Sequence, residues 1–426
     1  SDVPKGWQGG LPFRYRVTQG DATFRVRLTV EQERSVTETA NVLGVIEGAV
    51  WPEEKVVVGC HFDAWTFGAG DPHAGTIILY SVAEAFAAAA RDGLRPARTL
   101  VFANWGAEEM GIIGSTEWCE AHADDLSKNA VAYLNLDMAA MGTTFRSSAD
   151  PLLRTLIDGV ARRVPAADGE QTVHESVTAP NHVLNVGNLG GGSDHAGFYL
   201  HLGVPSFSLG AGGSSGVSYH SAHDHLRWYR QVVGDDYAGA VMLTRMASLA
   251  VAELANAPLH PFSLDAFAWG MHDHLRDLEQ RASALKVSLR RQYPSDRVGD
   301  LVNQIQRLGY TDTSPGLVVQ RLQDAAEAGG LDADTAAEVN RHLRALSRAW
   351  LSEDGLPGRP WYRNLYASTD PNSGYAAWML PELRGAVEAR DENAAQLALI
   401  RLSGRISAIE AILVKLQMIH ERVSAD

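Results

Sequence analysis

The chain has 426 residues, of which 45% are hydrophobic, so its length predicts two domains and its composition supplies sizeable cores. A formal net charge of −14 disfavours nucleic acid or an anionic membrane as a partner, and we expect neither. Two cysteines, Cys60 and Cys119, are too few for a disulfide framework and leave the redox compartment open.

We expect no membrane-spanning segment, because the sequence has no stretch of about 18 uncharged apolar residues. A signal-peptide pattern is also missing. The chain opens at Ser1 without an initiator Met, which indicates that a preceding segment has been removed.

Residues 1–34 are expected to be a linker and a strand left from that preceding segment. Gly and Pro are frequent in residues 1–20, as in linkers. Apolar residues alternate with Arg over residues 24–30, which is typical of a half-exposed strand.

Residues 35–256 alternate between strand and helix patterns, which predicts an α/β fold with a mostly parallel mixed sheet flanked by helices. The expected strands are short apolar runs at residues 41–47, 56–60, 99–105, 131–137 and 205–209. The expected helices lie at residues 75–91, 115–123, 151–163 and 236–255. A turn is expected at residues 51–54.

Residues 257–426 are expected to form a second, all-α domain, because the pattern beyond residue 256 is almost entirely that of amphipathic helices. The expected helices cover residues 263–291, 325–350 and 381–423, and a loop rich in Gly and Pro at residues 354–367 interrupts them.

Candidate metal ligands follow three of the expected strands. His61 follows the strand at residues 56–60, Glu108 and Glu109 follow the next, and Asp137 ends the strand at residues 131–137. The carboxyl ends of parallel strands meet at the same edge of an open α/β sheet, and ligands bind at that edge. Neighbouring residues on an extended chain point in opposite directions, so one glutamate can bind a metal while the other faces a bound water.

Three further residues complete the candidate set. Asp71 lies in a tight glycine-rich loop and could bridge two ions, while Asp63 could orient the His61 ring. His220 follows the glycine-rich residues 212–216. Each residue alone has an ordinary explanation as a buried His–Asp pair, a turn aspartate, a helix cap or a loop histidine. Together they are the ligand inventory of two zinc ions about 3.5–4 Å apart.

Residues 59–72, 105–118 and 219–221 resemble the zinc-site motifs of the glutamate carboxypeptidase II / transferrin-receptor family of co-catalytic zinc exopeptidases. Residues 356–363 and Tyr375 resemble the helical, dimer-forming domain of that family, and the similarity runs from about residue 35 to the C-terminus. The resemblance implies peptide hydrolysis by a water bridged between two zinc ions.

The resemblance also implies a role for each matched residue. Asp71 would bridge both ions, His61 and Asp137 would bind one zinc, and Glu109 and His220 the other. Glu108 would be the general base, Asp63 would orient His61, and Tyr219 would donate a hydrogen bond to the substrate carbonyl or oxyanion. Substrate contacts are expected from Ser193, Asp194 and Tyr375.

Departures from the family pattern indicate a substrate other than an acidic peptide. Glutamate-specific members place two arginines where this chain has residues 206–209 (Ser-Phe-Ser-Leu), and a lysine where it has Gly374. Without those cations an acidic side chain loses its charge-assisted partners, so we expect neutral or apolar side chains. Gly106 replaces a common aspartate. Aminopeptidase and carboxypeptidase polarity both remain open.

The family comparison implies several further features. Glu117 and Glu120 match two carboxylates of a calcium site, although a solvated helix face explains them equally well. A protease-associated domain would precede residue 1, the helical domain would form a homodimer, and the location would be outside the cytoplasm. The alternative function is a catalytically silent, transferrin-receptor-like binding or scaffold protein that keeps a metal site.

Overall fold

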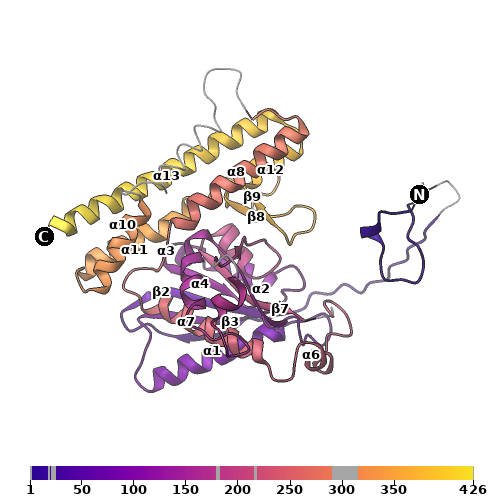
Figure 1. The fold of residues 1–426 in the computed structure, drawn as a ribbon, viewed down its shortest axis with the longest axis horizontal. Helices are drawn as coiled ribbons and strands as arrows, with labels where there is room; N and C mark the ends of the chain where they lie inside the picture. Colours follow the sequence, from indigo (N-terminus) through magenta and orange to yellow (C-terminus); the bar gives the residue numbers. More distant parts are fainter. Residues whose placement is uncertain are drawn as a thin grey trace. The chain divides into compact units, whose positions relative to one another are not determined.

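The computed structural model describes residues 2–17, 20, 25–178, 183–214, 218–289 and 315–425 (Figure 1). The chain divides into two compact units, Ser1–Glu38 and Thr39–Asp426.

The first unit is small and has little regular structure. It contains the short 3-10 helix η1 (Lys5–Trp7) and a bridge between Asp2 and Arg16. The expected strand at residues 24–30 is wrong for residues 25–30, which have no strand partner, and Val26 and Leu28 are 80% and 83% exposed. Residue 24 lies outside the described residues. An alternating pattern is not sufficient for a strand, because a strand also needs a neighbour for its backbone hydrogen bonds.

The second unit is built on a seven-stranded sheet with the order β1-β3-β2-β4-β7-β5-β6. The strands are β1 (Val42–Ile46), β2 (Trp51–His61), β3 (Arg98–Trp105), β4 (Ala130–Asn135), β5 (Gly142–Ala149), β6 (Val186–Gly187) and β7 (Ser206–Gly213). The central strands β3, β2, β4 and β7 are parallel, whereas β1 and β5 run antiparallel to their neighbours β3 and β7. The expected mostly parallel mixed sheet is therefore confirmed.

Side chains of alternating direction build a core on each face of this sheet. Val56 and Val58 of β2 point to the core that contains α1 (His73–Arg91), α4 (Arg154–Ala161) and α7 (Ala238–Asn256). Val57 points instead to the core that contains α2 (Ile113–Ala121), α3 (Ala123–Asn129) and the short helix η3 (Gly197–His201). Because of this alternation, helices cover both faces of the sheet, and this part of the chain has three layers.

Two predictions in this part were wrong or incomplete. Residues 51–54 were expected to form a turn, but they are the first residues of β2. Glu54 is buried there and forms an ion pair with Arg98. Strand β5 was not expected, because its hydroxyl-rich sequence has no apolar run and its pairing with β7 supplies the missing support. The short helices η2 (Pro151–Leu153), α5 (Val173–Thr178) and α6 (Leu226–Val232) complete this part of the chain.

By length and composition alone, α1 and α7 are each apolar enough to cross a membrane, although both contain charged residues. Both helices contribute to the core on one face of the sheet. Such core helices pass the same compositional test, so they carry no argument for a membrane span.

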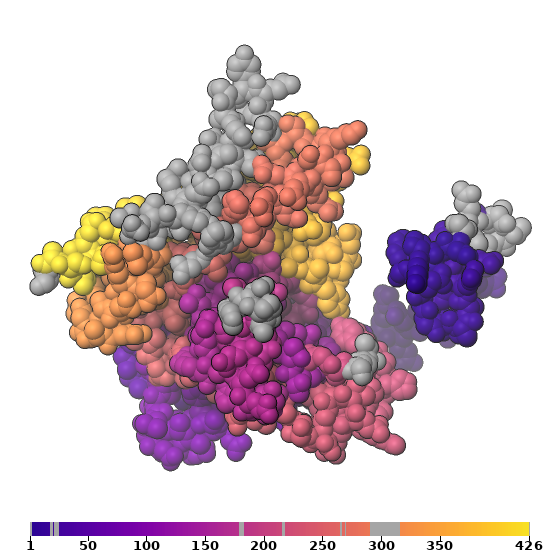
Figure 2. All heavy atoms as spheres, viewed as in Figure 1, coloured from indigo at the N-terminus to yellow at the C-terminus, as the bar shows by residue number. Residues whose placement is uncertain are grey.

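The C-terminal part of the second unit is helical, as expected. Its elements are α8 (Asp265–Leu285), α10 (Pro315–Glu327), α11 (Ala333–Arg348), the hairpin β8 (Ala367–Thr369) and β9 (Ala377–Met379), α12 (Pro381–Glu388) and α13 (Glu392–Ala425). Two of the expected helices are each broken in two, at Gly329 and at Arg390, which both have positive φ. Figure 2 shows the helical residues, orange to yellow, gathered beside the magenta residues of the sheet region.

Buried polar contacts join the helical part to the sheet part. Glu54 of β2 forms ion pairs with Arg98 of β3 and with Arg344 of α11. The Ser347 side chain of α11 donates a hydrogen bond from Oγ to Asp150 Oδ2, in the loop after β5, at 3.2 Å. The predicted boundary at residues 256 and 257 therefore lies inside the second compact unit.

Candidate metal site

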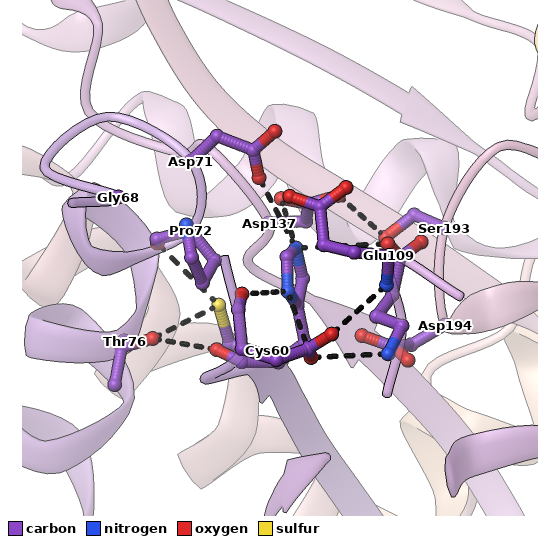
Figure 3. A network of polar contacts seen from close by, with 12 residues as sticks. Cys60, Gly68, Asp71, Pro72, Thr76, Glu109, Asp137, Ser193 and Asp194 are labelled. Atoms are coloured by element: carbon purple, nitrogen blue, oxygen red, sulfur yellow. Dashed lines mark hydrogen bonds and ion pairs between the residues drawn. The ribbon is translucent and has the colours of Figure 1, made fainter. Parts of the chain in front are cut away.

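The predicted ligands converge at the carboxyl edge of the parallel strands. His61 is the last residue of β2 and pairs in register with Trp105, the last residue of β3. Glu109 lies in the turn after β3, and Asp137 lies two residues beyond β4. Figure 3 shows Asp71, Glu109 and Asp137 gathered in this region. The parallel arrangement of β3, β2 and β4 is what brings them together.

His61 makes the contacts of the first ligand group. Its Nε2 lies 3.1 Å from Asp137 Oδ1 and 3.2 Å from Asp71 Oδ1. Its Nδ1 lies 3.0 Å from the backbone carbonyl oxygen of Asp63, which can only accept, so Nδ1 carries a proton. The fixed tautomer leaves Nε2 free to bind a metal when the ring is neutral.

Asp63 supports the site differently from what the sequence suggested. Its backbone carbonyl orients the His61 ring, whereas its carboxylate oxygen lies 3.5 Å from His61 Nδ1. The carboxylate accepts hydrogen bonds from the backbone N–H groups of Glu108 and Glu109, at 3.0 and 3.1 Å. Asp63 therefore fixes the turn that carries both glutamates.

The second ligand group contains Asp71, Glu109 and His220. His220 Nε2 lies 3.1 Å from Asp71 Oδ2 and 3.1 Å from Glu109 Oε2. Asp71 thus turns one carboxylate oxygen to His61 and the other to His220. In each group of three residues the ligand atoms lie within 4.8 Å of one another.

The donor set fits divalent zinc. Imidazole nitrogen and carboxylate oxygen are both common zinc ligands. Glu109 Oε1 is buried and has no hydrogen-bond partner within the described part of the chain, so it is available for a cation. Several carboxylates at short distances repel one another unless positive charge is present, and a pair of divalent ions would supply it.

The protonation equilibria of the site show the same need for positive charge. Burial, with the nearby charges of Asp194 and Asp137, raises the pKa of Glu108 to about 9. Burial lowers the pKa of His61, but the hydrogen bonds with Asp137, Asp63 and Asp71 outweigh it and raise that pKa. The acidic surroundings that raise these two pKa values would equally favour a bound cation.

Ser193 and Asp194, both expected to contact substrate, have different positions. Ser193 lines the pocket beside the ligands and donates a hydrogen bond to Asp137 Oδ2 at 2.8 Å. Asp194 is fully buried, with its Oδ1 bound by Ser115 Oγ at 2.7 Å. The expectation of a substrate contact is wrong for Asp194, since no surface of that side chain faces solvent.

The pocket beside the ligands combines acidic metal-site residues with neutral side chains. The neutral lining includes Asn135, Ser148, Leu189, Ser193 and Ser208, and no Lys or Arg lines it among the residues that the structure describes. Tyr219 and Tyr375 also line it, with their hydroxyl oxygens 3.1 Å apart. Tyr219 stacks on the ring of the ligand His220 with centroids 3.7 Å apart.

Two other sequence observations have structural explanations. A Cβ atom at Gly106 would lie 2.5 Å from the carbonyl oxygen of Ala40, so residues 39–41 leave no room there for a side chain. Glu120 accepts a hydrogen bond from the Trp361 indole, and neither Glu117 nor Glu120 belongs to a candidate ligand group in the described residues.

Sequence reasoning missed one buried carboxylate that touches this site. Asp224, four residues after His220, accepts hydrogen bonds from the backbone of Gly70 and Asp71. The only signal in the sequence was an acidic residue close behind a ligand histidine, which is too common to single out.

Fold and site together define a class of protein, an α/β chain with a candidate metal site at the edge of its sheet and an appended helical part. Residues 41–235 match the model of peptidase family M28, and residues 313–414 match the model of the transferrin receptor-like dimerisation domain. The sheet part of the chain is thus similar to peptidase family M28, and the helical part is similar to the transferrin receptor-like dimerisation domain.

Curated relatives share both parts. A probable glutamate carboxypeptidase, LAMP1, of Arabidopsis thaliana is 34% identical over 84% of this chain and 50% of the relative. A probable glutamate carboxypeptidase of Arthroderma benhamiae is 30% identical over 96% of this chain and 55% of the relative. The aminopeptidase NAALADL1 of Rattus norvegicus is 26% identical over 97% and 59%. The chain spans about half the length of the curated relatives it matches.

Proposed function

We propose that the chain is a zinc-dependent exopeptidase with a site for two zinc ions. The observation that carries this proposal is the arrangement of Asp71, whose two carboxylate oxygens face His61 at the end of β2 and His220 in a later turn, at 3.2 and 3.1 Å. A single ion would need only one of these groups. Asp71 would bridge the ions, with His61 and Asp137 on one side and Glu109 and His220 on the other.

Zinc in this site would supply Lewis acidity, which lowers the pKa of a bound water towards neutrality. Glu108 lines the pocket and belongs to neither ligand group, so its carboxylate is free to accept a proton from the attacking water. Glu108 would then pass that proton to the leaving amine. The hydroxyl group of Tyr219 would donate a hydrogen bond to the oxygen that gains negative charge.

The preferred substrate side chain would be neutral or apolar. Ser208 lies in the segment of β7, residues 206–209, where glutamate-specific relatives are expected to carry two arginines, and its cross-strand partners in the lining, Asn135 and Ser148, are uncharged. A buried carboxylate without a cationic partner is costly, so acidic residues are disfavoured. One relative is named as a probable glutamate carboxypeptidase and another as an aminopeptidase. Whether this chain would remove residues from the N-terminus or the C-terminus of a peptide is left to experiment.

We further propose that the helical part forms a homodimer in which α13 contributes the contact. On α13 a stripe of exposed residues recurs every three or four positions; it consists of Leu397, Ile400, Gly404, Ser407, Ala411, Val414 and Met418. Leu397, Val414 and Met418 are 60%, 59% and 64% exposed. Figure 1 shows α13, in yellow, as the outermost long helix of the helical part. Such spacing suits a helix–helix seam, and the match to the dimerisation domain covers most of the stripe.

The experiment that tests the enzyme proposal incubates zinc-loaded protein with free, N-acetylated and C-amidated versions of several neutral peptides and follows the products by mass spectrometry. Stepwise loss of terminal residues, abolished by a chelator and restored by zinc, supports the proposal. Blocking by N-acetylation marks an aminopeptidase, and blocking by C-amidation marks a carboxypeptidase. No cleavage of any peptide with two zinc ions bound would instead favour the binding or scaffold function.

A further inference from the structure

The two ligand groups differ in what holds them in place. His61 ends β2 and Asp137 lies two residues beyond β4, so the sheet fixes both side chains. Asp71 and His220 lie in loops, and His220 has a positive φ of 53°. Two of the three ligands of the second group therefore depend on whatever fixes the distance between these loops.

Asp224 joins the two loops. Its Oδ1 accepts a hydrogen bond from the Gly70 N–H at 2.8 Å, and its Oδ2 accepts one from the Asp71 N–H at 2.9 Å. Within its own loop, Oδ1 also accepts from Ser218 Oγ at 3.1 Å. The residue is 3% exposed, so these bonds do not compete with solvent. One buried carboxylate thus connects the backbone of the bridging ligand with the segment that precedes His220.

The connection is continued by the backbone. The carbonyl oxygen of Asp224 accepts a hydrogen bond from the Ala69 N–H at 3.2 Å, and Thr66 Oγ1 donates to the carbonyl oxygen of Ser221 at 2.9 Å. A Cβ atom at Gly70 would lie 3.0 Å from Asp224 Oδ1, so the glycine permits this close approach. The two loops therefore behave as one hydrogen-bonded unit, with Asp224 at its centre.

We propose that Asp224 is a positioning residue that holds the Asp71 loop and the turn with His220 at the separation needed by the second zinc. The inference rests on the proposed two-zinc function. Asp224 does not line the pocket and belongs to neither ligand group, so it acts through other residues. Its loss should affect the Asp71–Glu109–His220 group more than the group that contains His61 and Asp137, which the sheet supports.

Replacing Asp224 by Asn tests this inference. Asparagine has the same size but only one acceptor oxygen, so one of the two loop contacts becomes a clash between two N–H donors. The loss of a supporting contact of this kind weakens metal binding about 10- to 100-fold. We expect that loss for one of the two zinc ions, with the other bound nearly as in the wild type.

The measurement is a calorimetric titration of the metal-free protein with zinc in the presence of a competing chelator. Asp150→Asn is the matched control, because Asp150 is 4% exposed and also accepts one backbone N–H and one serine hydroxyl, from Leu152 and Ser347. Gly70→Ala is a second test that keeps Asp224 but pushes the loop away from it. Circular dichroism of the metal-free variants checks that each is folded, and Gly70→Ala carries the test if Asp224→Asn is not.

The expected result is two tightly bound ions in the wild type and in Asp150→Asn, and one tight and one weakened ion in Asp224→Asn, with a smaller loss of the same kind in Gly70→Ala. Wild-type affinity for both ions in these two variants, or an equal loss of both ions, would overturn the positioning role. A wild-type chain that binds fewer than two ions would contradict the proposed function itself.

Discussion

At the scale of single residues, the division of labour between the adjacent glutamates is the main chemical feature. Both glutamates line the pocket, but Glu109 lies 3.1 Å from His220 in a ligand group, whereas the carboxylate of Glu108 is 3.9 Å from His61 and belongs to neither group. Asp63 holds the backbone of both residues, so their side chains diverge from a fixed turn. A ligand and a base can therefore come from consecutive positions.

The role of Glu108 can be tested by changing it to Gln. The side chain keeps its size but loses its basicity, so we expect turnover of a neutral peptide to fall by about 10²- to 10⁴-fold. Zinc content should stay unchanged, since Glu108 belongs to neither ligand group. Elemental analysis and peptide hydrolysis on the same sample check both points, and turnover close to that of the wild type would remove Glu108 from the role.

His274 of α8 provides a pH-dependent test of stability away from the site. Burial, with the positive charge of Arg154 nearby, lowers the pKa of His274 to about 4. The unfolded chain therefore takes up a proton at higher pH than the folded chain. The stability present above pH 6.5 should be lost as the pH falls towards 4, by on the order of 3 kcal/mol.

Urea unfolding of the metal-free wild type and of His274→Gln at pH 7 and pH 4 measures this effect. The variant should lose less stability on acidification than the wild type, because it has no imidazole to protonate. Equal losses in both proteins would contradict the lowered pKa of His274.

At the scale of elements, much of the sheet could be predicted because its strands are continuous apolar runs. Residues 56–60 are buried and apolar, and they lie within β2. Strand β5 could not be predicted, because Gly142, Arg146 and its hydroxyl residues depend on pairing with β7 rather than on a local pattern. Asp224 was missed for the same reason, since its partners Gly70 and Asp71 are about 150 positions away.

The position of Ser208 on β7 predicts a route to altered specificity. Replacing it by Arg would place a cation in the neutral pocket, so acidic side chains should gain about 10- to 100-fold in kcat/KM relative to neutral ones. Ser208→Gln, which is long but uncharged, is the control. Competition between neutral and acidic peptides measures the ratio, and an unchanged ratio in the Arg variant would show that Ser208 does not face the substrate side chain.

Helix α13 predicts how the chain associates. Val414→Glu would bury a charge in the proposed helix–helix seam, so we expect dimerisation to weaken by about 100-fold or more. Lys415→Glu introduces the same side chain one position away from the stripe and should leave the dimer intact. Light scattering across a range of protein concentrations distinguishes these results, and a dimer that tolerates both changes would place the contact elsewhere.

At the scale of the whole molecule, the sheet and the helical part act together on the pocket. Tyr375 belongs to the helical part, yet its hydroxyl oxygen is 3.1 Å from that of Tyr219. The residues of the metal site come from the last position of β2, from the loops after β2, β3 and β4, and from the turn before α6. The sequence motifs were sufficient to predict which residues are the candidate metal ligands. The distances between these side chains could not be predicted, because they depend on the parallel order β3-β2-β4 and on the packing of the helical part.

The central claim is that Asp71 bridges two zinc ions, and zinc content is its most direct test. Wild-type protein and Asp71→Ala should be loaded with zinc, dialysed and analysed for metal per chain. We predict two zinc ions in the wild type and a loss at both sites in the variant, because the two ligand groups share Asp71. Retention of two tightly bound ions in Asp71→Ala, or a single ion in the wild type, would contradict the account.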